Sequence, residues 1–226
     1  MSYSIIIPVY NEIFTLPKLI KNLQKLDNDI QIIIVDDGSD DGSDKILKKH
    51  AKKIDIIQNE SNLGKGSSIV LGVEIARNQN IILIDGDLEI EIDCIPNLIV
   101  EYEKNNYTTL IGYRWDNKDG INFELNRFGN YIINSLFNLL YFSSIKDVLC
   151  CVRIIKSDLI RSLNLNSKRF SIEVETLGKL VLHKKKIIQS KVHYNRRTKQ
   201  QGKKLKMSDA WRIITVMLYN KFLHKI

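Results

Sequence analysis

The sequence predicts an α/β fold in which a mostly parallel central sheet is flanked by helices. Short apolar segments alternate with segments of helical periodicity over roughly the first 90 residues, a pattern typical of β-α-β units. The apolar segments are nearly continuous, as expected for strands that are covered on both faces. Polar clusters directly follow three of these segments, at the place where ligands bind in an open α/β sheet.

The first half of the chain contains the regular part of this pattern. The segment 4–9 is rich in β-branched residues and contains Pro8, which favours a short buried strand. Apolar residues recur at helical spacing between 16 and 23, and a glycine-containing turn at 62–66 precedes another helical segment. We therefore expect strands at 4–9, 30–35, 55–58 and 80–84, and helices at 16–23, 44–53 and 67–78.

The second half is less regular but continues the same fold. We expect helices at 94–105, 126–141, 170–182 and 208–222, strands at 107–112 and 186–194, and an extended segment at 147–155. No internal repeat or low-complexity linker divides the chain. A single domain at 1–226 is therefore expected, with a first half at 1–112, a second half at 113–206 and a final amphipathic helix at 207–226.

The positive charge of the chain is concentrated in one segment. The net charge is +8, and Lys184–Lys206 holds ten Lys and Arg residues with no Asp or Glu, so that without this segment the net charge is −2. A solvated tail would explain such a run, but apolar residues at strand-like spacing interrupt its first half. A basic surface favours an anionic partner such as a phosphate or an anionic lipid. A nucleic-acid partner is not expected, because the chain has no recognisable nucleic-acid-binding module.

The cysteines and the N-terminus favour a cytoplasmic protein. Three cysteines, two of them adjacent, provide neither a disulfide framework nor metal-ligand spacing. The N-terminus has no basic stretch and reaches Pro8 too early for a signal peptide. The longest uncharged run, 128–145, contains several Asn and Ser residues, and we interpret it as an amphipathic helix instead of a membrane span.

Three acidic residues follow the strand expected at 80–84. Asp85, Asp87 and Glu89 stand on every second residue, so an extended backbone would direct all three carboxylates to one face. Oxygen ligands this close suit a hard divalent cation, Mg²⁺ or Mn²⁺. An acidic turn after a strand would give the same pattern, and this motif alone does not decide between the two.

Two further clusters lie at the same end of the expected sheet. Asp36 and Asp37 begin an acidic, glycine-containing stretch that could form a turn and helix cap, or accept hydrogen bonds from a nucleobase or ribose. The turn at 62–66 places Lys65 at a helix start, where it would favour an anion. A simple glycine turn is the alternative.

These clusters, in this order, resemble the family 2 glycosyltransferases of the GT-A fold. The matching segments are SIIIPVYNE at 4–12, IIIVDDGSDDGS at 32–43, NLGKGSSIVLG at 62–72 and IDGDLEIEIDCIP at 84–96. The last segment corresponds to the D-x-D region of the family. The resemblance therefore implies a nucleotide-diphosphate sugar donor, bound in the first half of the chain with a metal ion on its diphosphate.

The resemblance also implies roles for individual residues of the donor site. Either Asp36 or Asp37 would contact the base or ribose, and Glu89 would be a third metal ligand. The nucleotide site would be lined by Pro8, Tyr10 and Glu12, and Asp85 and Asp87 would hold the nucleotide and Mg²⁺ or Mn²⁺.

The second half looks like the dolichyl-phosphate mannose synthase group and its polyprenyl-phosphate relatives. The matching segments are NRFGN at 126–130, KDVLCCVR at 146–153, FSIEVE at 170–175 and YNRR at 194–197 with QGKK at 201–204. The chain departs from the group at Gly112-Tyr113-Arg114, where the group has serine in the middle. The resemblance implies a lipid-phosphate acceptor, and this departure bears on which acceptor or sugar is used.

The kind of acceptor decides which residues are needed for catalysis. A lipid phosphate is already an anion and needs cations to hold it; the candidates are Arg114, Arg127, Arg196, Lys203 and Lys204. A hydroxyl acceptor, as in the synthesis of a surface glycan, would need a general base, first Asp147 and behind it Glu173 or Glu175. Asp147 could equally cap a helix or pair with an arginine.

Lipid contact would also account for two amphipathic helices. The helix at 128–142 and the one around 211–222 carry apolar faces that could lie in a buried core or on a membrane surface. The expected attachment is peripheral, at the cytoplasmic face, directly or through an anchoring partner or a homo-oligomer. The enzymatic rival from another class is a nucleotidyltransferase, which would release pyrophosphate.

Overall fold

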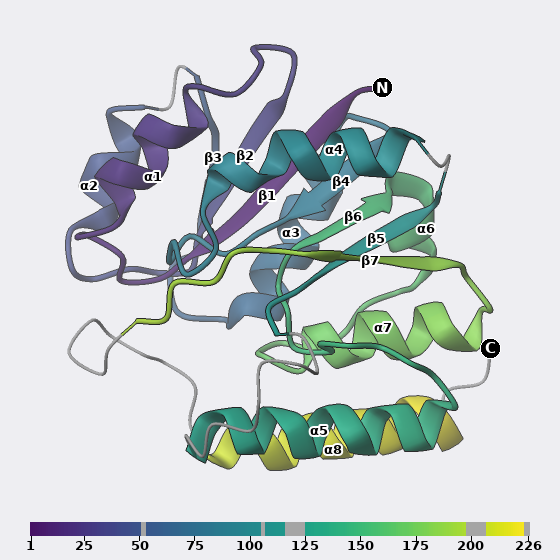
Figure 1. Ribbon diagram of the computed structural model, residues 1–226. Helices are drawn as coiled ribbons and strands as arrows, with labels where there is room; N and C mark the ends of the chain where they lie inside the picture. Colours follow the sequence, from purple (N-terminus) through teal and green to yellow (C-terminus); the bar gives the residue numbers. More distant parts are fainter. Residues whose placement is uncertain (51–52, 105–106, 116–124, 198–206, 224–226) are drawn as a thin grey trace.

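A sheet of seven strands forms the centre of the part of the chain that the computed structural model describes, which is residues 1–50, 53–104, 107–115, 125–197 and 207–223 (Figure 1). The strand order is β3-β2-β1-β4-β6-β5-β7. The predicted α/β class with a mostly parallel sheet is confirmed. The strands are β1 Tyr3–Val9, β2 Gln31–Asp36, β3 Asp55–Gln58, β4 Asn80–Leu83, β5 Thr109–Tyr113, β6 Arg153–Lys156 and β7 Ile187–Lys191.

One strand runs against the others. β1 pairs in parallel with β2 and β4, β2 with β3, and β5 with β7, whereas β6 is antiparallel to both β4 and β5. β5 lies two positions from β4, and β6 fills the position between them. The extended segment expected at 147–155 is wrong in its first part, because a turn at Val148 and Leu149 precedes the strand. Asp147 precedes this turn and accepts a hydrogen bond from the backbone N–H of Arg114, directly after β5.

Helices cover both faces of the sheet (Figure 1). One face is covered by α1, α2 and α4, and the other by α3, α5, α6, α7 and α8. Residues of β1 alternate between the two layers: Ile5 and Ile7 pack with α1 and α4, and Ile6 packs with α3. The helices are α1 Leu16–Leu23, α2 Ser43–Lys48, α3 Lys65–Ile75, α4 Ile95–Lys104, α5 Leu125–Tyr141, α6 Ser157–Ser162, α7 Ile172–Leu182 and α8 Met207–Phe222, with a 3₁₀ turn at Ile92–Cys94.

The predicted helices are present, with shifted ends. α2 ends at Lys48 and not at 53, and α3 begins at Lys65 and not at 67. Gly64, with a φ of 96°, sets the start of α3, because such a positive angle interrupts regular backbone immediately before the first helical residue. The short α6 and the 3₁₀ turn were not predicted, since neither is long enough to show a periodic pattern.

α5 and α8 lie side by side in the layer farthest from the sheet, with α7 between them and the strands (Figure 1). Their inner faces are buried, as Phe137 of α5 and Met217 of α8 show. Their outer faces and ends expose large apolar side chains. The sequence left open whether the apolar residues of these helices lie in the core or on a surface, and the structure shows some of them in each place. In the described ranges, no helix has the length and apolar character needed to cross a bilayer. The exposed side chains are Tyr131, Ile132, Leu139, Phe142, Trp211, Leu218, Tyr219, Phe222 and Leu223.

Candidate active site

The predicted acidic residues gather at the carboxyl ends of β1, β2 and β4. These three strands are parallel neighbours, so the segments that follow them begin at the same end of the sheet. β4 ends at Leu83, and the following residues form a turn in which Leu88 has a φ of 58°. The expected extended backbone through Asp85, Asp87 and Glu89 is therefore wrong, and the three carboxylates are placed by a turn.

Lys65 sits between two carboxylates from different elements. Its Nζ lies 2.7 Å from Asp85 Oδ1 and 2.5 Å from Glu173 Oε1, at the start of α7. Burial alone would lower the pKa of Lys65, but the charges of Asp85 and Glu173 raise it above the usual range. The lysine predicted as an anion-binding residue is thus a charged ammonium paired with two carboxylates. Glu173 Oε2 is buried without a hydrogen-bond partner in the described residues.

Asp87 lies beside Asp85 and has less positive charge around it. The backbone N–H of Glu89 donates to Asp87 Oδ1 at 3.0 Å. Burial, followed by the charge of Asp85, raises the pKa of the Asp87 carboxyl to about 7. A cation bound between these two carboxylates would relieve both effects, which is the fit expected of a divalent metal site.

The segment after β7 closes the site on its other side. The Tyr194 hydroxyl donates to Glu89 Oε2 at 3.1 Å, and the backbone N–H of Arg197 donates to Glu89 Oε1 at 3.0 Å. The Arg197 guanidinium donates to both oxygens of Glu12, at 3.1 and 2.6 Å. Glu12 and Glu89 are thereby held by the same strap of chain, residues 194–197.

Negative charge predominates in these contacts. Among the described residues, these contacts bring five carboxylates together with two cations, Lys65 and Arg197. In the described part of the chain, no three His, Cys, Asp or Glu side chains lie close enough to hold a metal ion by themselves. That Asp85 and Asp87 hold a cation, with Glu89 as a third ligand, stays a prediction. The five carboxylates are Glu12, Asp85, Asp87, Glu89 and Glu173.

Asp36 and Asp37 have different roles in the structure. Asp37 accepts hydrogen bonds from the Asn59 side chain and from the backbone N–H groups of Leu63 and Gly64, at 2.8–2.9 Å. It therefore shapes the turn at 62–66. Asp36 Oδ1 accepts from Ser39, whereas the buried Oδ2 has no hydrogen-bond partner in the described residues. Of the two aspartates, Asp36 thus has an acceptor available for a ligand.

The turn at 62–66 is packed directly against a loop from the second half. A Cβ built on Gly66 would lie 1.7 Å from the carbonyl oxygen of Ser167, and one on Gly64 would lie 2.2 Å from that of Lys168. The backbone N–H of Gly66 donates to the Lys168 carbonyl at 3.0 Å. Only glycine permits this approach, which brings Lys65 to Glu173.

Asp147 is paired with an arginine, one of the alternatives that the sequence allowed. Arg114 Nε donates to Asp147 Oδ2 at 2.7 Å and Arg114 Nη2 donates to Oδ1 at 3.0 Å. The backbone N–H of Arg114 also donates to Oδ2, at 3.1 Å. The Arg114 guanidinium stacks on the rings of Trp115 and Tyr194. Tyr194 thereby contacts both this ion pair and Glu89.

The structure gives less information about the remaining predicted site residues. Pro8 and Tyr10 are partly buried at the end of β1, and Arg196 is exposed. Lys203 and Lys204 lie outside the described residues, as does the side chain of Arg127. Glu175, a possible base, pairs with Lys179 at 2.7 Å within α7.

Two arginines of the site were missed by the sequence reasoning. Arg197 lies in the matched segment YNRR, where we selected Arg196; the bidentate contact with Glu12 identifies Arg197 as the residue at the site. Arg153 is fully buried, and its guanidinium donates to the carbonyls of Glu173, Val148 and Cys150. It ties the start of α7 to the loop after Asp147. The signal that could have identified Arg153 is a charged residue within an apolar strand.

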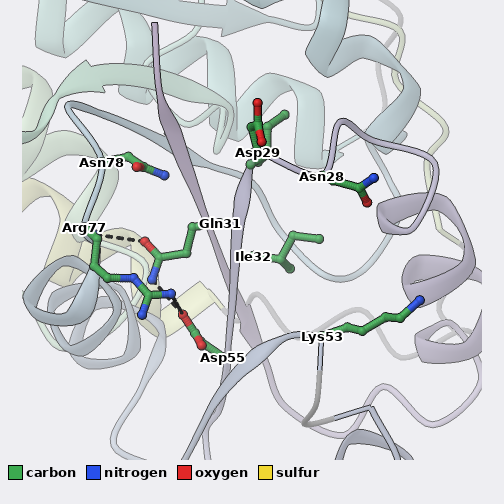
Figure 2. A pocket seen from close by; sticks show the side chains of 9 residues that line it. Asn28, Asp29, Gln31, Ile32, Lys53, Asp55, Arg77 and Asn78 are labelled. Carbon is green, nitrogen blue, oxygen red and sulfur yellow. Dashed lines mark hydrogen bonds and ion pairs between the residues drawn. The ribbon is translucent and has the colours of Figure 1, made fainter.

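A polar hollow at the opposite end of the sheet is not part of this site (Figure 2). There, Arg77 pairs with Asp55, Gln31 Nε2 donates to Asp55, and the Arg77 backbone N–H donates to Gln31. These polar groups satisfy one another, and the hollow lies at the amino ends of β2 and β3, away from the acidic cluster.

The family model described as Glycosyl transferase family 2 matches residues 4–163. The chain belongs to this family. It is a glycosyltransferase, as the motifs at the carboxyl ends of β1, β2 and β4 predicted. An uncharacterized protein from Methanocaldococcus jannaschii is 35% identical over 169 residues, which cover 70% of this chain and 73% of that protein.

Named relatives include two polyprenyl-phosphate sugar transferases. Undecaprenyl-phosphate 4-deoxy-4-formamido-L-arabinose transferase from Pseudomonas fluorescens is 37% identical over 110 residues, covering 45% of this chain and 32% of that protein. Dodecaprenyl-phosphate galacturonate synthase from Rhizobium johnstonii is 24% identical over 173 residues, covering 73% and 51%. The matches thus span about a third and about half of the lengths of these two relatives.

Solved structures confirm the predicted GT-A fold of this glycosyltransferase. Glucosyl-3-phosphoglycerate synthase from Mycobacterium tuberculosis, in complex with Mn²⁺, uridine diphosphate and phosphoglyceric acid, superposes with a TM-score of 0.77 at 15% identity. The superposition covers 99% of this chain and 80% of that one. At this identity, the likeness shows the fold.

Proposed function

We propose that this glycosyltransferase moves a sugar from a nucleotide-diphosphate donor to the phosphate of a polyprenyl lipid, with inversion at the sugar carbon. The observation that carries the choice of acceptor is that every candidate base is already paired with a cation. Asp147 pairs with Arg114, Glu173 with Lys65, and Glu175 with Lys179. A hydroxyl acceptor would require one of these carboxylates to leave its cation and take a proton. A phosphate acceptor is already an anion.

The names of two relatives support the same acceptor. Both are transferases or synthases of undecaprenyl or dodecaprenyl phosphate sugars. The donor site would comprise the residues at the carboxyl ends of the parallel strands, and its nucleotide would be UDP or GDP. Asp36 Oδ2, a buried acceptor without a partner in the described residues, would receive a hydrogen bond from the base or ribose.

Asp85 and Asp87 would hold Mg²⁺ or Mn²⁺, with Glu89 as a possible third ligand. When bound, the ion would neutralise charge on the departing diphosphate. Lys65 would lie next to this ion and would contribute positive charge to the diphosphate once Asp85 is engaged by the metal. Arg114, beside Trp115 and Tyr194, would face the acceptor phosphate together with Arg127, Arg196, Lys203 and Lys204.

Sugar transfer to lipid can be measured directly. The purified chain would be mixed with Mn²⁺, polyprenyl phosphate in detergent, and radiolabelled UDP-glucose or GDP-mannose, and label would be counted after extraction into organic solvent. We expect label that requires both metal and lipid phosphate, and none with Asp87→Asn. Transfer to a soluble glycan but not to lipid phosphate would instead establish the hydroxyl-acceptor alternative.

We also propose that the exposed apolar surface of α5 and α8, the α5–α8 surface, rests on the cytoplasmic face of a membrane. Its exposed side chains are large and apolar, and no charged residue occurs between Gly129 and Phe142. Lys221 stacks on Tyr141 and Phe142 at the edge of this surface, where it can reach anionic head groups. The three cysteines, all within the described residues, are unpaired, which agrees with a reducing compartment.

Vesicle flotation tests this attachment. Leu139, 71% exposed on α5, is replaced by glutamate, and Val100, 51% exposed on α4 at the other face of the sheet, serves as the matched control. Leu139→Glu should lower the bound fraction and Val100→Glu should leave it unchanged. Equal binding by both variants would favour attachment through a partner subunit or oligomer.

A further inference from the structure

A second cavity lies between α7, α8 and the loop at 166–171. Its volume is about 910 Å³, larger than the polar hollow at the other end of the sheet. The turn at 62–66 separates it from the donor site: Lys65 points to Asp85, whereas Leu63 and Ser67 line the cavity. Neither the donor nor the acceptor residues proposed above line it.

The cavity carries a surplus of positive charge. Lys168, Arg169 and Arg212 line it, all three are exposed, and none has a carboxylate partner within the described part of the chain. Its acidic residue, Glu175, is neutralised by Lys179 at 2.7 Å and also accepts from the backbone N–H of Ser167 at 2.7 Å. An anion is therefore the ligand that this lining favours.

A buried donor in the wall points independently to a ligand. Asn220 on α8 lines the cavity and is 2% exposed, yet its Nδ2 has no hydrogen-bond partner among the described residues. Buried amide groups are nearly always hydrogen-bonded, and an unpaired one is costly. A ligand oxygen in the cavity would satisfy it.

The mouth of the cavity meets the α5–α8 surface. Trp211 and Tyr219 line the cavity, are 75% and 52% exposed, and belong to the α5–α8 surface. Aromatic side chains of this kind prefer the boundary between apolar and polar layers of a membrane. A ligand that enters here would thus have an anionic end among cations and an apolar end beside aromatic rings.

We propose that this cavity binds the phosphate head group of a membrane lipid, at a place separate from the acceptor site. Arg212 and Lys168 pair with the phosphate, the Asn220 amide donates to it, and the lipid chain leaves past Trp211 and Tyr219. The proposal rests on the membrane attachment described above. Because the loop at 166–171 also packs on the turn that carries Lys65, an occupied cavity adds support to the donor site.

Vesicle binding distinguishes a phosphate site in the cavity from attachment of the α5–α8 surface alone. Phosphatidylcholine vesicles with and without phosphatidic acid are compared for the protein, for the double variant Lys168→Gln, Arg212→Gln, and for the control Lys21→Gln, Lys25→Gln. The control removes the same charge at exposed positions of α1 and just after it, on the other face of the sheet. Loss of two cations near an anionic surface should weaken binding to phosphatidic acid about 30-fold, and the control should change it less than about twofold.

A second variant distinguishes a defined site from diffuse attraction. Asn220→Leu retains all charges and removes a buried amide nitrogen that has no partner among the described residues, so the melting temperature of the variant should stay the same or rise. It should still lose part of the preference for phosphatidic acid. If the melting temperature falls steeply with no change in lipid preference, the amide is structural and the proposal is wrong.

Two further measurements identify which molecule supplies the phosphate. Stabilisation of the protein by inorganic phosphate alone, absent in the double variant, would show a site that also takes soluble phosphate. A raised KM for polyprenyl phosphate in the double variant would show that the acceptor itself occupies the cavity, and it would overturn a lipid site separate from the acceptor site. Equal binding of all variants to both vesicles would overturn the cavity site while leaving attachment and sugar transfer standing.

Discussion

Replacing Gly66 with alanine tests whether the contact between the turn at 62–66 and the loop at 166–171 builds the donor site. The new Cβ would lie 1.7 Å from the carbonyl oxygen of Ser167 and 3.0 Å from the carbonyl carbon of Lys168. Both are backbone atoms, which cannot rotate away. The turn and the loop would therefore have to separate by roughly 1.5 Å to reach van der Waals contact.

The energetic cost follows from what that separation breaks. The backbone N–H groups of Gly66 and Ser67 donate to the Lys168 carbonyl at 3.0 and 3.4 Å, and their loss costs about 1 kcal/mol each. Overpacking adds about 1–3 kcal/mol. Alanine recovers about 1 kcal/mol of helix propensity in α3. The net expectation is a loss of about 3 kcal/mol in the free energy of unfolding, or a melting temperature about 6–12 °C lower for a chain of this size.

Gly129 provides a matched control within α5. A Cβ at Gly129 would meet no atom within 4 Å, so the same substitution should raise the free energy of unfolding by about 0.5–1 kcal/mol. Thermal unfolding followed by circular dichroism measures both variants. The same samples, titrated with a nucleoside diphosphate below the melting transition, should show weaker binding for Gly66→Ala, because Lys65 moves with the turn. If Gly66→Ala were as stable as Gly129→Ala, the close approach would not be a feature of the folded protein.

Three further predictions concern the charged groups. Arg114→Met leaves the carboxylate of Asp147, a residue only 4% exposed, without its cation, and should lower the free energy of unfolding in urea by about 3–5 kcal/mol. The double variant Arg114→Met, Asp147→Leu should recover most of this loss, and no recovery would contradict the pairing. Burial and the charge of Asp85 raise the pKa of Asp87 to about 7, so below that pH a proton competes with the metal for this carboxylate. Mn²⁺ should therefore raise the melting temperature of the protein more at pH 8 than at pH 6. An equal increase at both pH values would argue against a metal on Asp87. Asp87→Asn should lose the Mn²⁺ effect at both pH values with an unchanged far-ultraviolet spectrum, and a retained effect would place the ion elsewhere.

The sequence determined the α/β class and the location of the candidate site. Near-continuous apolar strands alternating with helices allow few arrangements other than a covered parallel sheet, because such strands must be buried on both faces. Once the strands are parallel, the polar clusters after β1, β2 and β4 must meet at one end. The resemblance to family 2 glycosyltransferases rests on local motifs in the order of the chain, and the family match confirms it.

Long-range pairing could not be determined in this way. The antiparallel β6 enters between β4 and β5, although 69 residues lie between Leu83 of β4 and its partner Arg153 of β6, and no local pattern specifies that position. The same holds for Lys65 and Glu173, and for Glu12 and Arg197, whose partners lie more than one hundred residues away. Local spacing also predicted an extended backbone for residues 85–89, which is wrong because the left-handed conformation of Leu88 turns the chain there.

Only the tertiary structure decided which contacts each of these charged residues makes. Asp36 and Asp37 are adjacent and chemically identical in the sequence, yet Asp37 holds a turn and Asp36 has an oxygen without a partner among the described residues. Asp147 is chemically able to serve as a base, but it is paired with Arg114. The types of residues and their order along the chain are properties of the sequence. Which charges neutralise one another depends on distances of a few ångströms, because Coulomb and hydrogen-bond energies fall steeply over that range.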